Sequence, residues 1–386
     1  MKRTLFLLCF FILFTSKVFA QLYDISNAEF DYYDENRDRF VNTFVYYPSV
    51  IDEYNTETFP FVVFGHGFSM SYASYSYLWE HLVPRGYIVV VPNTETGVIG
   101  VNHGDFGNDL GFLAGYFYEN SLDPESLFYN QVEQYPAVIG HSMGGGATHL
   151  ASESYTGDIQ TAISFAAAET DPSAIDAVAN ANLPLYIFYG EYDAVSPPAE
   201  NQIAIYNNSN SSCKTLINVL GGGHCFFADE DWVCDVADGS ETTISREEQH
   251  DITLDFLNLI LDYELQGNNQ ALVTLEDSLD NSVRISSTRD CITTSVIPEH
   301  GNHQHSDQLQ NCMYPNPARD FIYIRLKQES NLTISDTSGK IVKHYSLLSG
   351  INKINLNGLP TGTYHITVSG NAGNYKKTGR LIIQGN

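Results

Sequence analysis

The sequence predicts a doubly wound α/β domain, in which helices cover both faces of a mostly parallel sheet, followed by a small all-β sandwich. Two observations predict the first domain. Apolar runs typical of buried strands alternate with stretches of helical pattern, and about 270 residues are enough for one such domain. Short strands separated by turn residues near the C-terminal end predict the sandwich.

The predicted elements alternate along the chain. Strands are runs of apolar, β-branched and aromatic residues, and helices are longer segments with an apolar face. The strands are expected to end near Tyr47, Phe64, Val91, Ile139, Phe165, Tyr189 and Leu220. The helices are expected at 72–83, 108–118, 142–152, 199–206 and 246–265, with a further one at 271–280.

The most informative motif is Gly-x-Ser-x-Gly at 140–144. A strand-like run at 136–139 precedes it and a helix-compatible segment at 147–152 follows, which is the context of a nucleophile elbow. The serine of such an elbow sits on a turn so tight that its flanking positions need glycine, because a Cβ would clash there. The turn exposes the Ser142 hydroxyl and places the Met143 N–H where an oxyanion would form.

A nucleophile elbow needs an acid and then a histidine further along the chain. Asp193 follows the strand-like run 185–189 and precedes two prolines, which suits a fixed carboxylate. His224 lies on a glycine-rich loop after the run 216–220, from which it can reach over the serine. In this hypothesis His224 takes the proton of Ser142 and Asp193 orients the imidazole.

Other residues compete for these two places, and a surface or packing role is the alternative for each of them. Chain order and position after a strand favour Asp193 and His224. The histidines next to the elbow, at 141 and 149, are expected to pack in the core. The competitors are Asp171, Asp176 and Glu191 for the acid, and His103 and His250 for the histidine.

A second oxyanion donor is expected upstream. The buried strand-like run 61–64 ends in Gly65-His66-Gly67-Phe68, and the loop after this strand supplies a backbone N–H in enzymes with a nucleophile elbow. The donor is expected to be Phe68. A plain strand-to-helix turn, which needs glycine as well, is the alternative interpretation of this loop.

With these motifs in place, residues 40–266 resemble an α/β hydrolase of the dienelactone hydrolase, cutinase and polyester hydrolase branch. The resemblance lies in Gly65-His66-Gly67-Phe68, in the elbow with its three glycines at 144–146, in the acid loop 190–197, and in Gly222-Gly223-His224. It implies an α/β-hydrolase fold and the site roles given above. Polyester hydrolases of bacteria usually carry a tryptophan after the strand that follows the elbow, whereas residues 166–171 here contain none.

The resemblance implies a secreted serine carboxylic-ester hydrolase that acts through an acyl-enzyme and needs no cofactor. Cutinase-like or polyester-hydrolysing activity, including that on polyethylene terephthalate, is expected. Cap domains of this architecture usually follow the strand ending at Phe165, and the short segment before Leu185 predicts an open cleft. Its rim is expected to contain Phe68, Met143, Tyr192 and Trp232. A lipase or other lipid esterase is one alternative, and a non-catalytic surface-binding protein on a hydrolase scaffold is another.

The two ends of the chain predict export. Residues 1–20 have the basic start, apolar centre and small-residue cleavage site of a signal peptide. Residues 21–290 are assigned to the catalytic domain, 291–312 to a linker and 313–386 to the β-sandwich. The sandwich resembles the C-terminal sorting domain of type IX secretion, through Tyr314-Pro315-Asn316-Pro317 and the turn at 359–364. This resemblance implies a type IX secretion machinery as partner, and release from the cell or attachment to its surface.

Charge supports the same division. The formal net charge is −27. Residues 21–312 hold seven Lys and Arg against 43 Asp and Glu, whereas residues 313–386 hold nine against three. A region as acidic as residues 21–312 repels nucleic acid and anionic membranes, and it suits neutral ester substrates. Nucleic-acid binding is therefore excluded, and a monomer is expected.

Exported proteins favour disulfides. Cys225 and Cys234 flank a short acidic loop just after His224, so a bridge between them would brace the histidine. Cys213 is a competing partner, and the sequence does not fix the pairing. Three histidines at 300–305 are interpreted as part of the linker, and no metal site is predicted. The cysteines that follow the signal peptide are Cys213, Cys225, Cys234, Cys291 and Cys312.

Overall fold

The computed structural model of the chain divides into two compact units, residues 1–294 and 295–386. The first unit is described at residues 22–52, 54–238 and 241–291, and the second at 313–314, 318, 321–326, 329–337, 339–348, 350–370 and 376–383. The predicted signal peptide, and the predicted linker from residue 292 onward, lie outside these residues. Within the described residues, no helix is long and apolar enough to cross a membrane.

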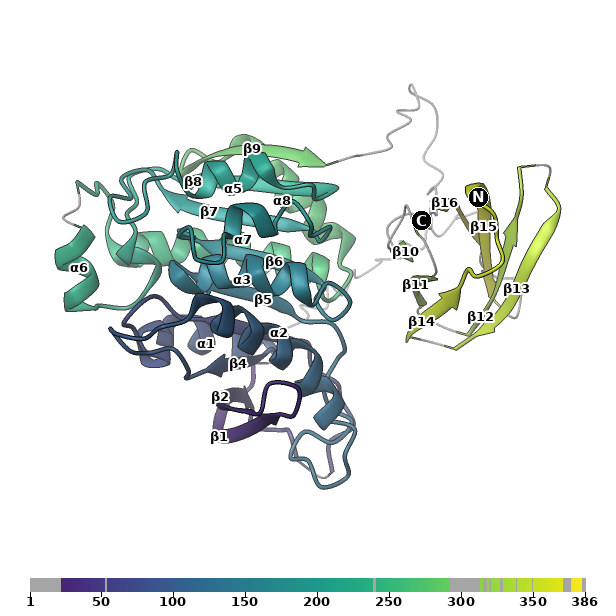
Figure 1. Cartoon of the computed structure of the whole chain (residues 1–386), viewed down its shortest axis with the longest axis horizontal. Helices are drawn as coiled ribbons and strands as arrows, with labels where there is room; N and C mark the ends of the chain where they lie inside the picture. Colours follow the sequence, from purple (N-terminus) through teal and green to yellow (C-terminus); the bar gives the residue numbers. More distant parts are fainter. Residues whose placement is uncertain are drawn as a thin grey trace, which may run out of the picture. The chain divides into compact units, whose positions relative to one another are not determined.

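The first unit is built on one mixed sheet of nine strands (Figure 1). The central strands pair in parallel, and the outer pairs β1–β2, β2–β4 and β8–β9 are antiparallel. This confirms the predicted fold class. The strands, in their order across the sheet, are β1 (Ile25–Asp34), β2 (Arg39–Pro48), β4 (Ile88–Pro92), β3 (Phe61–Gly65), β5 (Ala137–His141), β6 (Thr161–Phe165), β7 (Leu185–Gly190), β8 (Cys213–Val219) and β9 (Ile285–Cys291).

The two edge strands β1 and β9 were not predicted, and their burial explains why. Both have one face open to solvent, and β9 has a single fully buried residue, Ile285. Neither strand therefore contains the continuous apolar run that marks the central strands, since parallel strands are buried on both faces.

Helices connect the strands. The helix α2 begins at His103, before the expected position, and its N-cap Asn102 accepts a hydrogen bond from the Asp105 N–H. The short helices α4 and α6 were not expected. The helical elements are η1 (Tyr72–Tyr75), α1 (Ser76–Leu82), η2 (Val83–Arg85), α2 (His103–Asn120), α3 (Met143–Ser154), α4 (Ala174–Ala177), α5 (Gln202–Asn208), η3 (Cys225–Phe227), α6 (Trp232–Asp238), α7 (Arg246–Glu264) and α8 (Asn269–Asn281).

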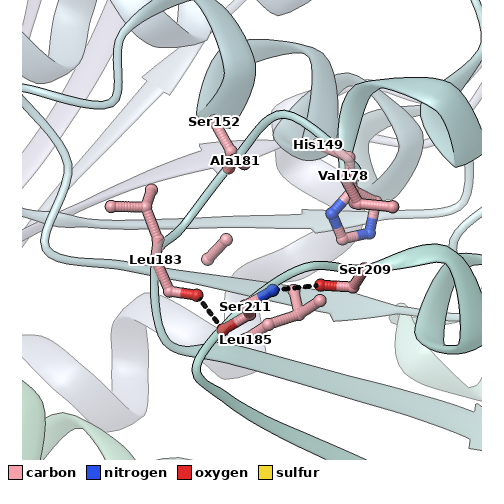
Figure 2. Close-up of a pocket in the computed structure, with 9 residues that line it drawn as sticks. His149, Ser152, Val178, Ala181, Leu183, Leu185, Ser209 and Ser211 are labelled. Carbon is pink, nitrogen blue, oxygen red and sulfur yellow. Dashed lines mark hydrogen bonds between the residues drawn. The ribbon is translucent and has the colours of Figure 1, made fainter. Parts of the chain in front are cut away.

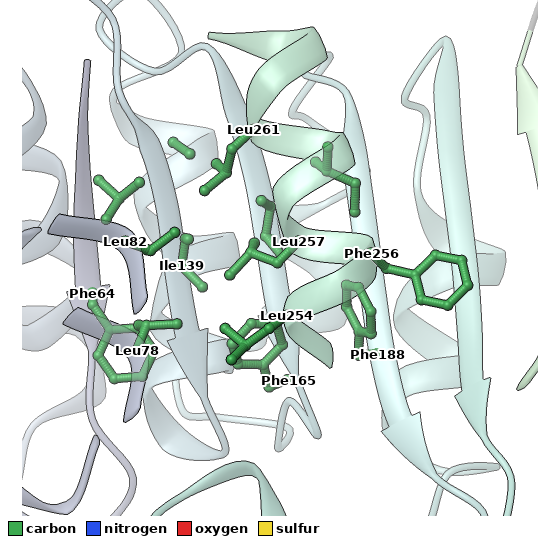
Figure 3. Packing of buried hydrophobic residues seen from close by; sticks show 14 of the residues in the cluster. Phe64, Leu78, Leu82, Ile139, Phe165, Phe188, Leu254, Phe256, Leu257 and Leu261 are labelled. Carbon is green, nitrogen blue, oxygen red and sulfur yellow. The ribbon is translucent and has the colours of Figure 1, made fainter. Parts of the chain in front are cut away.

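The sheet has an apolar core on each face. Alternate strand residues point to opposite faces, so that Val62 and Phe64 join the helices α1, α7 and α8, whereas Val63 joins α2 and α3. Figure 3 shows the first of these cores, in which Leu257 and Leu261 of α7 pack over the central strands. Two packed layers around a central sheet hold the carboxyl ends of the parallel strands in fixed positions.

The second unit consists of two small antiparallel sheets. Buried side chains from both sheets form its own core, including Ile322, Ile334 and Ile366. The three-stranded sheet contains β10 (Met313–Tyr314), β11 (Phe321–Leu326) and β14 (Gly350–Asn355), and the four-stranded sheet contains β13 (Ile341–Leu347), β12 (Ser330–Ser335), β15 (Gly362–Gly370) and β16 (Lys376–Ile383).

Candidate active site

The elbow joins β5 directly to α3. Ser142 lies between them with φ 55° and ψ −117°, a strained conformation for a residue with a side chain. A Cβ on Gly140 would lie 2.1 Å from the Gly144 carbonyl oxygen, and a Cβ on Gly144 would lie 2.2 Å from the Gly65 carbonyl oxygen. The two glycines are therefore required by close backbone packing, as the motif predicts.

The structure brings the three predicted residues Ser142, His224 and Asp193 into one line of hydrogen bonds. The Ser142 Oγ lies 2.9 Å from Nε2 of His224, and Nδ1 of His224 lies 2.9 Å from Oδ2 of Asp193. All three residues are buried, with 8% exposure for Ser142, 1% for His224 and 5% for Asp193. Since a carboxylate only accepts, Nδ1 of His224 carries a proton and Nε2 is free to accept the serine proton.

The Asp193 carboxylate is held by its own loop. Its Oδ1 accepts hydrogen bonds from the N–H of Val195 at 3.1 Å and of Ser196 at 2.7 Å, which leaves Oδ2 for the histidine. A carboxylate with all of these donors in place cannot rotate away from the imidazole without losing them. The loop thus fixes the direction in which Asp193 points.

The His224 loop is held by side chains from α6 and α7. The Gln249 side chain accepts from the Gly223 N–H and donates to the Gly223 carbonyl, both at 2.9 Å. Arg246 donates to the carbonyls of Cys225 at 2.5 Å and Ala228 at 2.7 Å. The disulfide Cys225–Cys234 closes the loop on its other side. The contacts of Gln249 and Arg246 were not predicted from the sequence. The Cys225–Cys234 bridge was considered there, but the sequence left the pairing open.

Two backbone N–H groups were predicted as oxyanion donors, and both lie on the elements where the sequence placed them. Met143 is the first residue of α3, and Phe68 lies on the loop after β3. Within the described residues, neither N–H donates a hydrogen bond to another group. The first N–H groups of a helix have no partner inside the helix and favour negative charge. The two N–H groups therefore remain candidate donors to an oxyanion.

The competing residues lie elsewhere. Asp171 and Asp176 are exposed, and Glu191 accepts the Gly221 N–H at 2.8 Å. His103 accepts the Asp171 N–H at 3.2 Å, and His250 stacks on Tyr77 with ring centroids 3.7 Å apart. None of these five residues forms a hydrogen bond with Ser142 or His224.

The residues expected at the rim differ in exposure. Phe68 is 50% exposed, Tyr192 36% and Trp232 78%, whereas the Met143 side chain is 3% exposed and packs in the core beneath α3. Met143 can therefore offer its backbone N–H but not its side chain. The only helix between β6 and β7 is the single turn α4, so no cap domain is inserted there. Within the described residues, no cluster of histidine, cysteine or acidic residues could hold a metal ion.

The small pocket drawn in Figure 2 is a different site. Its His149 lies on α3 with Nε2 3.2 Å from Ser164 Oγ, and within the described chain Nδ1 has no partner. Burial lowers the pKa of His149 to about 3, so the imidazole is neutral. The pocket contains none of the predicted site residues, and it is lined by His149, Ser152, Ala162, Val178, Ala181, Leu183, Leu185, Ser209 and Ser211.

The sheet order, the elbow and the loops at its carboxyl edge define an α/β hydrolase. Residues 35–237 match the family described as PET hydrolase-like, and the chain belongs to that family. The match includes Ser142, Asp193 and His224. A relative among known proteins is Chlorophyllase-1 of Arabidopsis thaliana, 28% identical over 115 residues, which make up 28% of this chain and 34% of the relative. The chain thus spans about a third of the length of that relative.

The C-terminal unit has a match of its own. Residues 312–384 match the secretion system C-terminal sorting domain. The protein is therefore secreted or attached to the cell surface. Its disulfides Cys213–Cys291 and Cys225–Cys234 fit an extracellular location, where thiols are oxidised.

Proposed function

We propose that this protein is a serine carboxylic-ester hydrolase that acts through an acyl-enzyme. The observation that carries the proposal is the unbroken line from Ser142 Oγ through His224 to Asp193, beside two backbone N–H groups with no partner of their own. A structural role would explain a buried histidine and aspartate pair. It would not explain a strained serine at the end of the line.

The proposed reaction has two halves, acylation and deacylation, which use the same groups. The Ser142 Oγ attacks the ester carbonyl carbon while its proton passes to Nε2 of His224, and Asp193 stabilises the imidazolium. The N–H groups of Phe68 and Met143 donate to the oxyanion, each contributing about 3–4 kcal/mol to the transition state. His224 then protonates the leaving alkoxide. A water molecule, deprotonated by His224, attacks the acyl-enzyme. As the second oxyanion collapses, the bond from the acyl carbon to Ser142 Oγ breaks, His224 returns the proton to Oγ, and the acid is released.

Substitution of the nucleophile tests this proposal. Ser142→Ala and His224→Ala should each reduce kcat on a soluble nitrophenyl ester by roughly 10⁴-fold or more, because such residues act as a unit. Ser164→Ala, which removes a buried hydroxyl next to His149, is the matched control and should keep its activity. A Ser142→Ala protein that unfolds like the parent and retains most of its turnover would contradict the proposal.

The charges of the first unit support a neutral substrate. All seven Lys and Arg of residues 21–312 lie in its described part, and each is bonded to a carboxylate or a carbonyl. Arg246, which lies beside His224, is bonded to Asp235 and to loop carbonyls. Among residues 21–312, every Lys and Arg thus has an intramolecular partner that competes with an anionic substrate, whereas the exposed side chains of Phe68, Tyr192 and Trp232 can bury apolar groups, at about 25 cal/mol per Å².

We therefore propose short- to medium-chain esters as soluble substrates and, because no cap domain follows β6, a cutinase-like activity on polyesters such as polyethylene terephthalate. The aromatic polymer should react slowly, because residues 166–171 offer no tryptophan for its rings. The test measures nitrophenyl esters of increasing chain length together with monomers released from amorphous polyester film. Activity on long-chain triglycerides without monomer release would identify a lipase instead, and inactivity on every ester would favour a surface-binding protein.

A further inference from the structure

A buried tyrosine lies between three parts of the candidate site. Tyr75, on η1, has 0% exposure, and its hydroxyl oxygen accepts the Gly67 N–H at 2.8 Å. The same oxygen lies 2.8 Å from Nδ1 of His141. Gly67 precedes the oxyanion donor Phe68, and His141 precedes Ser142. One phenol therefore connects the oxyanion loop to the last residue of β5.

His141 extends this connection to the histidine loop. It is fully buried, and its Nε2 lies 3.1 Å from the backbone carbonyl oxygen of His224. Since a carbonyl only accepts, Nε2 of His141 must carry the proton, and Nδ1 must be the acceptor. The Tyr75 hydroxyl then donates to Nδ1 while its oxygen accepts from Gly67. Met70 Sδ, 3.2 Å from the Tyr75 hydroxyl oxygen, is a second acceptor for the same proton, but a thioether sulfur accepts only weakly, so the imidazole nitrogen at 2.8 Å is favoured.

The electrostatics of the two residues agree with this pattern. Burial, and next to it the neighbouring His224, lowers the pKa of His141 well below its ordinary value. Burial also raises the pKa of Tyr75 well above its ordinary value. Both groups stay neutral across the working pH range, so they form a fixed set of hydrogen bonds and do not exchange protons with the substrate.

We propose that Tyr75 and His141 form a positioning relay, which holds the Gly67–Phe68 peptide and the His224 backbone at fixed places around Ser142. The proposal rests on the proposed esterase function. The peptide between Gly67 and Phe68 carries the second oxyanion donor, and the His224 carbonyl anchors the residue whose ring abstracts the proton. One pair of side chains thus holds both the proposed oxyanion donor and the backbone of the proton-accepting histidine.

The packing around Gly67 makes the relay sensitive to small shifts. A Cβ on Gly67 would lie 3.1 Å from the Tyr75 hydroxyl oxygen and 3.2 Å from Nδ1 of His141, with Met70 Sδ at 2.8 Å. The relay atoms therefore pack closely against the backbone of the oxyanion loop. A displacement of the phenol passes to this loop, because no side chain on Gly67 can absorb it.

The first test is Tyr75→Phe, which removes the hydroxyl and keeps the ring. On a soluble nitrophenyl ester, with active sites titrated by a fluorophosphonate, we expect kcat to fall about tenfold while KM changes less than twofold, since the loss concerns the transition state. Affinity for a boronic acid that mimics the tetrahedral intermediate should fall by the same factor. The midpoint of the acid limb of the kcat profile should stay in place, because no relay group titrates there.

Two further variants separate positioning from general stability. Tyr87→Phe removes the hydroxyl of another buried tyrosine, which lies just before β4 and donates to Asp262 on α7, and it should lower the unfolding temperature without changing kcat. His141→Gln keeps a donor near the His224 carbonyl and should lose less activity than His141→Leu. The double variant Tyr75→Phe/His141→Leu should lose no more kcat than the worse of the two single variants, because each substitution interrupts the same relay.

The relay is contradicted if Tyr75→Phe keeps its kcat per titrated site, or if the losses of Tyr75→Phe and His141→Leu multiply in the double variant. A shifted acid limb would also contradict it, since that result makes Tyr75 or His141 a proton-transfer group. These results are distinguishable from failure of the proposed function. In that case Ser142→Ala would remain active, whatever Tyr75→Phe does.

Discussion

The two sides of the candidate site are held in different ways. The elbow around Ser142 is fixed by backbone packed on backbone, with Gly140, Gly144 and Gly65 in contact inside the sheet and α3. The loop around His224 is fixed by side chains that come from α7 and by a disulfide. The nucleophile side therefore depends on close backbone packing that only glycine permits, whereas the histidine side depends on side-chain hydrogen bonds and on a disulfide.

The largest effect is expected at the elbow. Gly140→Ala places a Cβ 2.1 Å from the Gly144 carbonyl oxygen, an overlap that only a backbone shift can relieve. We expect a loss of more than about 3 kcal/mol in unfolding free energy, or no folded protein. Urea unfolding followed by tryptophan fluorescence measures this loss in the first unit, which contains both tryptophans, Trp79 and Trp232. The control is Gly157→Ala, where a Cβ meets no atom within 4 Å. Equal stabilities of the two variants would refute the packing argument.

The two disulfides should separate stability from activity. Cys213–Cys291 joins β8 to β9 across a sequence separation of 78 residues, and Cys225–Cys234 closes a loop across nine. Chain entropy predicts that replacing both cysteines by serine costs roughly 4–5 kcal/mol for the first bridge and roughly 2–3 kcal/mol for the second. Only loss of the second should lower kcat, because only that bridge holds the His224 loop. Unfolding curves measure the two losses of stability, and kinetics well below the unfolding transition measure kcat. A larger loss of kcat on replacing Cys213 and Cys291 would contradict this prediction.

The side-chain clamp on the histidine loop can be broken without touching the elbow. Gln249→Met leaves the buried N–H and carbonyl of Gly223 without their partner, which should cost about 2–3 kcal/mol. Active-site-titrated kinetics should show a severalfold lower kcat, because His224 follows Gly223 directly. The control is Gln270→Met on the exposed start of α8. If Gln249→Met loses stability but keeps its kcat, the clamp does not position His224.

The far end of α7 contains a buried carboxyl group whose contribution to stability depends on pH. Burial raises the pKa of Glu264 from 4.5 to about 7, against the opposing hydrogen bond from Tyr186. Because the folded pKa lies above the unfolded one, this stability is fully present below about pH 4.5 and is lost as pH rises to 7. The loss between pH 5 and 8 is about 2 kcal/mol. Glu264→Gln should remove this pH dependence without changing kcat. An unchanged pH dependence of unfolding would show that Glu264 is ionised in the folded state.

The same contrast explains what the sequence could predict. The elbow, the strand ends and the positions of Asp193 and His224 follow from local patterns, because glycine and apolar runs leave a signature within a few residues. Gln249, Arg246 and Tyr75 leave none, since each acts on a residue far from it in the chain. The edge strand β9 was missed for a related reason, because its exposed face interrupts any apolar run.

A fluorophosphonate probe reacts only with an activated serine, so it tests whether Ser142 is the nucleophile. The full-length protein is incubated with the probe, digested, and the modified peptide is identified by mass spectrometry. We expect one phosphonyl group per molecule, attached to Ser142, and labelling slowed by orders of magnitude in His224→Ala. Absence of labelling in the folded protein, or equal labelling of Ser142 in His224→Ala, would contradict the account.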